Sequence, residues 1–520
     1  MRVFSLIILS LIIISCKKNI STPNFLFIVV DDLGHRDLSV MGSDFYETPN
    51  IDRIALEGTI FTQGYANASV CSPSRASLLT GLYPTSHGIT DWIGAKYGLE
   101  WREIGRKTKL LPSKYVKHLS SDLTTLPEVL KLYNYNTFFS GKWHLGSKKQ
   151  KSLPTDHGFD INKGGYEIGG PYSGGYFSPF NNPFLKDKKE EKGMSLPMKL
   201  AYETSSFIKA NANKPFLAYL SFYAVHAPIQ SAKSKWSKYQ KKAVDQGIMQ
   251  DGFEMEKRLP VRINQDNPVY AGLLEHTDDA VGYVLKTIDD LGLNDNTVIV
   301  FVSDNGGVSS GDDYATSNVP LRGGKGYQWE GGTRIPFFIK APQIKNAPKK
   351  IDIPVTGADL LPTLLELAGI EEKNKVDGKS LVPLLKGKLF EDRFLYWHYP
   401  HYGNQGGDPN AIIRKGDWKL IYYFEDGKNE LYNLVNDIGE TNNIFNKFPD
   451  IGLELKNELK KWLILSNAII PEKDSLHNYE KEKKWLLENK QKIKLKVEKK
   501  RLLQLNPNYI PNKNWWGSED

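Results

Sequence analysis

Side chains that bind divalent cations follow two apolar runs that are far apart in this chain of 520 residues. The runs span residues 25–30 and 297–303, and the four residues that follow them are Asp31, Asp32, Asp304 and Asn305. Carboxylate and amide oxygens favour a hard cation, and calcium fits better than magnesium because it accepts several such oxygens at flexible geometry. Asp-Asp or Asp-Asn-Gly, taken alone, also occurs as a turn or a helix cap. The presence of one such pair at the end of each predicted strand favours a metal site.

A second set of residues supplies positive charge and proton transfer: Arg75, Lys142, His144, His226 and Lys325. Lys142 and His144 are two apart in SGKWHLG, so both point the same way if the chain is extended. Lysine and arginine beside a cation neutralise the oxygens of a tetrahedral oxyanion ester, and histidine transfers protons near neutral pH. Each of these residues taken alone also occurs in structural or solvated roles.

The amino terminus has the pattern of an export signal. Residues 1–15 contain an early arginine and an apolar run, which is typical of a signal peptide. Ser-Cys then resembles a bacterial lipoprotein signal, in which Cys16 is lipidated and residues 16–22 form a tether; the alternative is a plain secretory signal. Because Lys17 is not the aspartate that favours inner-membrane retention, we expect an exported lipoprotein, anchored in the outer membrane and facing the periplasm or cell surface.

The chain has two cysteines, and lipidation of Cys16 leaves Cys71 without a disulfide partner. Three interpretations stay open for Cys71: an inert buried thiol, a nucleophile, or a residue that is modified. The composition is that of a folded protein, with 40% hydrophobic and 25% charged residues. The net charge of +8 is compatible with an anionic substrate or with a solvated helix face, and no nucleic-acid partner is expected.

Two regions follow from the order of predicted elements. Helices and strands alternate over residues 23–385, which predicts an α/β fold with a large, mostly parallel sheet flanked by helices. Ligands of such folds bind beyond the carboxyl ends of the strands, where both acidic pairs and His226 are placed. Residues 386–520 predict a smaller C-terminal subdomain, with an antiparallel sheet and a basic helical tail.

The stretch CSPSRASLLTG, which contains Cys71, resembles the signature of the formylglycine-dependent type I sulfatases of the alkaline phosphatase superfamily. Other stretches resemble the same family in the same order, from residue 23 to about residue 450: FIVVDDLGHRDLSVMG, TPNIDRIALEGTIFTQGY, TGLYPTSHG, GKWHLG, DHGFD, HAP, VSDNGG, LRGGKGYQWEGGTRIP and ELYNLVNDIGETNNI.

The resemblance implies a catalytic cycle. A formylglycine-generating or sulfatase-maturing enzyme oxidises Cys71 to an aldehyde before export, and one hydroxyl of the hydrated aldehyde attacks the sulfur of a sulfate ester. The second hydroxyl then loses its proton and sulfate is expelled. Position by position, the resemblance assigns calcium to Asp31, Asp32, Asp304, Asn305 and the modified Cys71. It assigns diol stabilisation to Arg75 and Lys142, aldehyde regeneration to His144, and sulfate binding and alcohol departure to His226 and Lys325.

The expected substrate is a sulfated oligo- or polysaccharide. Aromatic residues in the ranges 163–184 and 396–403 are candidates for contact with sugars, or else belong to the core. Two rival functions stay open: a phosphonate or phosphate monoester hydrolase of the same superfamily, and a non-catalytic, glycan-binding surface lipoprotein.

Overall fold

The computed structural model describes residues 22–105, 108–172, 174–371 and 373–509. The predicted signal peptide, Cys16 and the tether up to residue 21 lie outside these ranges. Within them, no helix is both long enough and apolar enough to cross a bilayer.

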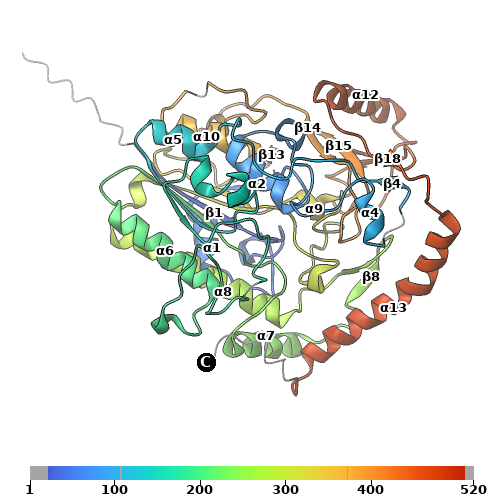
Figure 1. The fold of residues 1–520 in the computed structure, drawn as a ribbon, viewed down its shortest axis with the longest axis horizontal. Helices are drawn as coiled ribbons and strands as arrows, with labels where there is room; N and C mark the ends of the chain where they lie inside the picture. Colours follow the sequence, from blue (N-terminus) through green and yellow to red (C-terminus); the bar gives the residue numbers. More distant parts are fainter. Residues whose placement is uncertain (1–21, 106–107, 173, 372, 510–520) are drawn as a thin grey trace, which may run out of the picture.

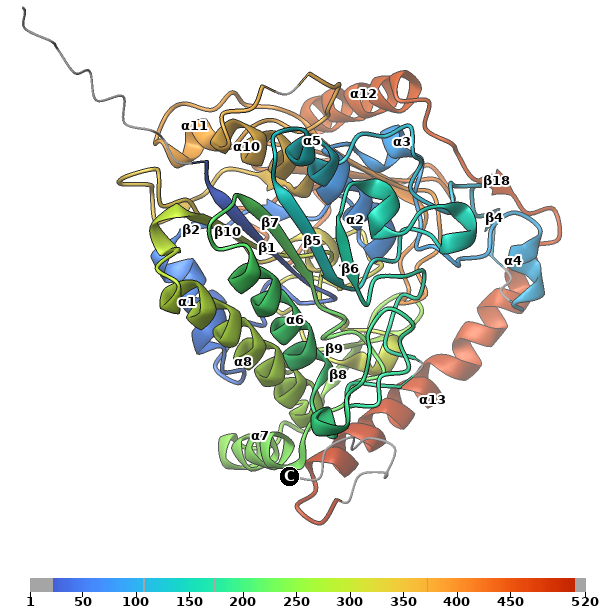
Figure 2. The ribbon, with the colours of Figure 1, turned by 60° about the vertical axis from the view of Figure 1, so that its left-hand side comes forward.

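An eight-stranded sheet forms the centre of the molecule (Figure 2). Its strands in spatial order are β12 (Lys350–Ile351), β2 (Thr59–Phe61), β11 (Phe337–Lys340), β10 (Thr297–Ser303), β1 (Asn24–Val30), β7 (Phe216–Ser221), β5 (Asn136–Gly141) and β6 (Ile161–Lys163). All neighbouring strands are parallel except where β11 pairs with β10 and β2. The predicted mostly parallel sheet is therefore confirmed.

Helices cover both faces of this sheet, which explains why its central strand β1 is apolar from Phe25 to Val30. Leu26, Ile28 and Val30 of β1 belong to one core layer, and Phe27 and Val29 to the other. The first layer includes α1 (Pro49–Glu57), α6 (Leu196–Ala210), α7 (Lys233–Gln246) and α8 (Pro268–Asp290). The second includes α2 (Cys71–Thr80), α5 (Leu126–Leu132), α10 (Leu360–Leu367) and α11 (Val382–Leu385).

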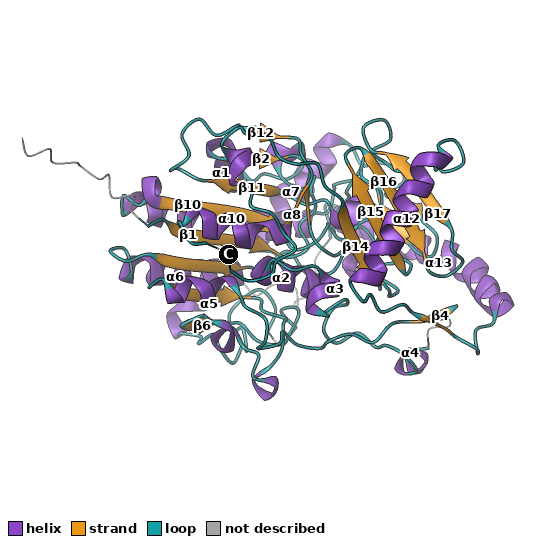
Figure 3. Cartoon of the chain, turned by 90° about the horizontal axis from the view of Figure 1, so that it is seen from above, coloured by secondary structure: helices purple, strands orange, loops and turns teal. Residues whose placement is uncertain are grey.

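A second, antiparallel sheet of four strands follows, as predicted (Figure 3). Its strands are β14 (Leu395–Tyr399), β15 (Asn410–Lys415), β16 (Trp418–Tyr423) and β17 (Asn429–Asn433). Two helices come after it, α12 (Pro449–Leu465), which packs on this sheet, and α13 (Tyr479–Leu505). The shorter elements are α3 (Pro84–His87), α4 (Glu100–Glu103), α9 (Glu330–Thr333) and the strand pairs β3 (Gly64–Tyr65) with β13 (Val355–Thr356), β4 (Leu110–Leu111) with β18 (Glu472–Lys473), and β8 (Phe253–Met255) with β9 (Pro260–Arg262).

Most of the aromatic residues in the range 396–403 belong to the core. Tyr396 stacks on Trp462 of α12 with 4.5 Å between ring centroids, and Trp397, Tyr399 and Tyr402 are buried. Trp397 packs against Tyr65 and Tyr402 stacks on Trp101, so packing, and not exposure to a ligand, accounts for these rings.

A buried ionic cluster joins the two sheets. Lys419 of β16 forms ion pairs with Glu330 of α9 at 3.0 Å and with Glu440 at 2.8 Å. Glu440 also accepts a hydrogen bond from the backbone N–H of Glu330. Burial raises the pKa of Glu440 to about 7, with Glu330 adding to the effect and Lys419 opposing it. Arg334 also forms an ion pair with Glu330, at 3.5 Å, whereas Glu440 is paired with Lys419. Both carboxylates are fully buried.

We expect Lys419→Met to lower the free energy of unfolding by about 3–5 kcal/mol, because it leaves the buried carboxylate of Glu440 without its cation. Denaturant unfolding measures the change. Lys415→Met on the neighbouring strand β15 is the matched control, and we expect it to cost less than about 1 kcal/mol because Lys415 is only half-buried. Equal costs for the two variants would contradict this account of the cluster.

Candidate active site

The register of the central sheet brings the predicted acidic residues together. Val30 of β1 pairs with Ser303 of β10, so the next residues, Asp31 and Asp304, emerge side by side at the carboxyl edge. β7 lies on the other side of β1 and ends at the same edge, five residues before His226. The predicted placement of these residues at one edge is confirmed.

Cys71 meets this edge as the first residue of α2, a helix whose ten residues are all buried. The Cys71 sulfur and carboxylate oxygens of Asp31 and Asp304 lie within 4.8 Å of one another. No side chain caps the start of α2, so the N–H groups that a helix leaves unpaired at its first turn remain available there. Such a helix start favours an anionic group.

Three buried cations face three buried carboxylates at the site. The contacts are Lys142 Nζ to Asp31 at 2.6 Å, Arg75 Nε to Asp304 at 2.8 Å and Lys325 Nζ to Asp32 at 2.7 Å. The Arg75 guanidinium also donates to the Lys142 carbonyl and the Ser221 hydroxyl, which fixes its orientation. The acidic and basic residues predicted from the sequence therefore form one charge-balanced cluster.

The oxygen atoms at the site fit a divalent cation. Asp31 Oδ1 and Asn305 Oδ1 are buried and accept no hydrogen bond. Arg75 Nη2 lies 3.4 Å from Asp31 Oδ1, too far away for a well-formed hydrogen bond. Buried oxygens without a hydrogen bond are costly unless a cation binds them. Asp32 differs, because its two oxygens already accept hydrogen bonds from Lys325 and from Asn305 Nδ2 at 2.8 Å. A cation would therefore find ready oxygens on Asp31 and Asn305, whereas Asp32 must first exchange a partner.

Burial and neighbouring charges set the pKa values of the site. Burial raises the pKa of Asp31 well above its usual value, with Asp304 adding to the effect. Burial also acts to raise the pKa of Asp304, but Arg75 and Lys142 outweigh it, and the pKa is lowered. For the Cys71 thiol, burial raises the pKa despite the opposing effect of Lys142 and Lys325. The unmodified thiol is therefore protonated at neutral pH and is a weak nucleophile.

His144 is oriented differently from the sequence expectation. The chain leaves the sheet at Gly141, and His144 has a φ of +56°, so the segment is not extended. Lys142 turns toward Asp31, whereas His144 Nε2 contacts the carbonyl of Ile93 at 3.0 Å. That contact leaves the buried Nδ1 of His144 without a hydrogen-bond partner. A neutral ring that donates through Nε2 therefore keeps Nδ1 as a free proton acceptor.

Both histidines are held in their neutral form. Burial lowers the pKa of His144 well below its usual value, and the Lys142 charge adds to this. Burial and Lys325 lower the pKa of His226 to about 3, although its Nε2 lies 3.7 Å from Asp32. Burial, with the surrounding cationic side chains adding to it, therefore disfavours the protonated form of both rings in the site as folded.

Sequence reasoning missed the groups that support the site. Ser72 accepts a hydrogen bond from the N–H of Ile93 at 3.0 Å and donates one to the His144 carbonyl at 3.0 Å. Ser72 thereby ties α2 to both segments that position the His144 ring. The position of Ser72 next to Cys71 is the one feature of the sequence that could have indicated this role. Ile93 contributes only backbone groups, which the sequence does not reveal.

The aromatic residues in the range 163–184 divide into two groups. Tyr166 and Tyr176 are buried in the core. Tyr172 is 61% exposed, and its ring packs edge-on against His226 with 6.0 Å between centroids. One aromatic side chain of this loop is therefore positioned at the mouth of the site.

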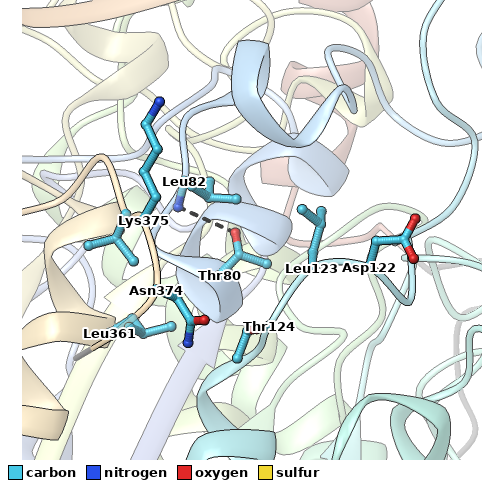
Figure 4. Close-up of a pocket in the computed structure, with 9 residues that line it drawn as sticks. Thr80, Leu82, Asp122, Leu123, Thr124, Leu361, Asn374 and Lys375 are labelled. Atoms are coloured by element: carbon cyan, nitrogen blue, oxygen red, sulfur yellow. Dashed lines mark hydrogen bonds between the residues drawn. The ribbon is translucent and has the colours of Figure 1, made fainter. Parts of the chain in front are cut away.

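A cavity of about 210 Å³ lies at the opposite end of α2 (Figure 4). Thr80 ends the helix there, and Leu123, Leu361 and Asn374 line the same space. A helix of ten residues is about 15 Å long, which separates this cavity from Cys71. None of the predicted site residues lines it.

Family models, relatives and solved structures match this chain, and together they cover most of its length. A family model described as Sulfatase matches residues 23–370, and one described as N-sulphoglucosamine sulphohydrolase, C-terminal, matches residues 324–465. A sulfatase of Formosa agariphila is 31% identical, covering 90% of this chain and 95% of the relative. An ulvan-active sulfatase of the same organism is 29% identical, covering 88% and 86%. The solved structure of Ps i-CgsB in complex with k-i-k-neocarrahexaose has a TM-score of 0.67 and 27% identity, covering 90% and 97%.

We expect the unmodified Cys71 thiol to react with iodoacetamide at least about tenfold more slowly than a free thiol at pH 7.5, because burial raises its pKa and blocks access. Protein made in a host without a maturation enzyme provides the thiol, and peptide mass separates Cys71 from Cys16. The same protein in guanidinium is the control, in which Cys71 reacts fully. Rapid labelling of the folded protein would contradict the described burial.

Proposed function

The chain belongs to the sulfatase family, and on that premise we propose that it releases sulfate from a sulfated oligo- or polysaccharide. The family assignment makes it a sulfuric ester hydrolase. The carbohydrate is supported by a relative that is named ulvan-active and by a similar structure in complex with neocarrahexaose. The observation that carries the proposal is Cys71, buried at the start of α2 between Asp31 and Asp304.

The proposed nucleophile is made from Cys71 by a formylglycine-generating or sulfatase-maturing enzyme. Two observations support conversion: the thiol is a weak nucleophile as encoded, and CSPSR has the pattern of the family's modification sequence. The modification supplies a hydrated aldehyde, whose hydroxyl is the attacking group in this family. Lys142 and Arg75 neutralise charge around that position, because both lie within the buried cluster.

The proposed metal is calcium, with magnesium the weaker alternative. Asp31 and Asn305 would hold it together with modified Cys71. Asp32 and Asp304 would join them after each exchanges a hydrogen-bond partner, because both oxygens of each carboxylate already accept hydrogen bonds. The bound cation would lower the pKa of the attacking hydroxyl and neutralise ester oxygens. Oxygen donors without thiolate or imidazole ligands support a hard cation over zinc or copper.

The remaining side chains would act on the ester itself. Lys325 is buried with its ammonium group near Asp32, from which it reaches ester oxygens. His226 would hold the sulfate group, and it would protonate the departing alcohol after the negative charge of the bound ester has favoured its protonated form. Nδ1 of His144, which has no partner, would accept the proton whose loss expels sulfate. Tyr172 at the mouth offers an aromatic face for a sugar ring.

The proposed location is outside the cytoplasm, at a membrane. Residues 1–15 have the pattern of an export signal and Cys16 that of a lipidation site. Attachment to the outer membrane through Cys16 would place the enzyme beside an extracellular or periplasmic polysaccharide.

The function is tested by sulfate release from a panel of defined sulfated oligosaccharides, with aryl sulfate and aryl phosphate as simple reference substrates. We expect aryl sulfate and at least one oligosaccharide to be turned over. Faster turnover of aryl phosphate would favour the phosphonate or phosphate hydrolase. Binding without turnover by fully modified protein would favour the glycan-binding lipoprotein.

We expect active protein to contain an aldehyde in place of the Cys71 thiol, shown by peptide mass and by hydrazide labelling. Cys71→Ala should lower kcat at least about 10³-fold while the far-UV spectrum stays unchanged, because the attacking group is lost. Unmatured wild-type chain is the matched control, since it differs only in the side chain of residue 71. An unmodified thiol in a fully active preparation would refute this nucleophile.

We expect calcium to stabilise chelator-treated protein by about 2–3 kcal/mol at a hundredfold excess over its Kd. Thermal unfolding measures this as a rise in Tm, and magnesium should give a smaller rise. Asp304→Asn should abolish the calcium-dependent rise, whereas Asp450→Asn at an exposed site of α12 should preserve it. A rise in Tm that persists in Asp304→Asn would place the metal elsewhere.

A further inference from the structure

α13 is a basic helix that lies beyond both family matches. The first match ends at residue 370 and the second at residue 465. Its 27 residues contain ten lysines and arginines and four glutamates, in a chain whose whole net charge is +8. Figure 1 shows it running along the outside of the molecule past β8 and α7. Most of its length is exposed to solvent, and its buried residues lie at the C-terminal end.

The exposed side of α13 carries a continuous stripe, here called the basic stripe. Its members are spaced three or four residues apart, which places them on one face of a helix: Lys481, Trp485, Glu488, Lys492, Lys496, Lys499 and Leu503. Trp485 is 52% exposed and Leu503 54%. Within the described ranges, the four lysines of the stripe form no ion pair with an acidic side chain. The stripe thus combines unneutralised positive charge with apolar surface.

The C-terminal end of α13 is anchored to the body of the protein through two ion pairs. Lys500 forms an ion pair with Asp313 at 3.0 Å, and buried Arg501 pairs with Asp266 at 2.6 Å. Asp312, which precedes Asp313, accepts a hydrogen bond from Gln405. Gln405 in turn packs against Gly326, where a side-chain carbon added to the glycine would lie 2.6 Å from the amide oxygen of Gln405.

Gly326 is the neighbour of Lys325, so this chain of contacts leads from α13 to the side chain that faces Asp32. A series of contacts therefore connects the C-terminal end of the basic stripe with the site, and the stripe extends from there along the helix. Lys481 and Lys499 are 18 residues apart, which corresponds to about 27 Å along a helix.

We propose that the basic stripe binds the sulfated polysaccharide chain outside the catalytic pocket and holds it near the site. The inference rests on the proposed function for the identity of the polymer. Charge complementarity supports it, because a chain of sulfate groups matches a row of unpaired lysines. Trp485 and Leu503 provide apolar area for the faces of sugar rings.

The pattern of the stripe favours a polyanion over a bilayer. Helices that lie on membranes separate an apolar face, which enters the lipid, from a lysine-rich face. In the basic stripe, Lys492 and Lys496 lie on the same face as Trp485 and Leu503. Inserting that face into lipid would bury the lysines with it, whereas a hydrated polysaccharide contacts both kinds of side chain.

The test compares two triple variants of the full-length protein. Lys492→Gln/Lys496→Gln/Lys499→Gln removes charge from the stripe and keeps a good helix former at each position. The control variant Lys456→Gln/Lys460→Gln/Lys461→Gln makes the same change in net charge on α12. Binding is measured by affinity electrophoresis with iota-carrageenan, with the desulfated polymer, and with vesicles containing phosphatidylglycerol. Turnover of aryl sulfate is measured in parallel.

We expect the stripe variant to bind iota-carrageenan about tenfold more weakly at low salt, with a smaller salt dependence than the wild type. The α12 variant should bind like the wild type, desulfated polymer should bind weakly to all three proteins, and aryl sulfate turnover should stay unchanged. Two results would overturn the proposal and leave the stripe as a solvated face. In one, both variants bind iota-carrageenan as tightly as the wild type; in the other, both lose affinity to the same extent.

Loss of vesicle binding without loss of carrageenan binding would also overturn the proposal, in favour of a membrane surface. Because polymer binding is measured without turnover, failure of the proposed sulfatase function appears separately, as an absence of aryl sulfate hydrolysis in the wild-type protein.

Discussion

The structure depends on three carboxylates and three cationic side chains that are held together at a buried site. Each carboxylate at the edge of the central sheet is paired with a cation from a different part of the chain: Arg75 in α2, Lys142 after β5 and Lys325 in a glycine-rich loop. Removing one partner from a buried pair typically costs about 3–5 kcal/mol. The groups proposed for catalysis are therefore also groups on which the packing of these segments depends. A dication and a singly charged sulfate ester that enter together would change the net charge of the cluster by only +1.

The loop that carries Lys325 reaches this cluster because glycines around it let neighbouring backbone segments approach closely. A side-chain carbon on Gly306 would lie 1.8 Å from the Gly331 carbonyl, so the chain after β10 and the start of α9 pass in direct contact. The buried cluster of Glu330, Lys419 and Glu440 then fixes α9 to the second sheet. The C-terminal subdomain thus holds one wall of the site in place, although it supplies none of the residues predicted for the site.

The sequence predicted the parts of the fold that repeat a simple pattern. Continuous apolar runs identified β1, β7 and β10, and the polar residues after them identified the site, because parallel strands share one carboxyl edge. Local backbone geometry was beyond this reasoning: His144 leaves the extended conformation, and Ser72 and the Ile93 carbonyl hold it through contacts between distant segments. The lowered pKa values of the histidines also depend on burial and on neighbouring cations that only the tertiary structure brings close.

The burial of Cys71 sets an order of events in the synthesis of the protein. Its side chain is 3% exposed once α2 packs against segments that include Asp304 and Lys325. These partners lie more than 230 residues further along the chain. At roughly 5–20 residues per second, a growing chain would leave residue 71 uncovered for on the order of 10–50 s. The proposed modification of Cys71 would therefore have to occur within a limited time, and any delay in completing the central sheet would lengthen that time.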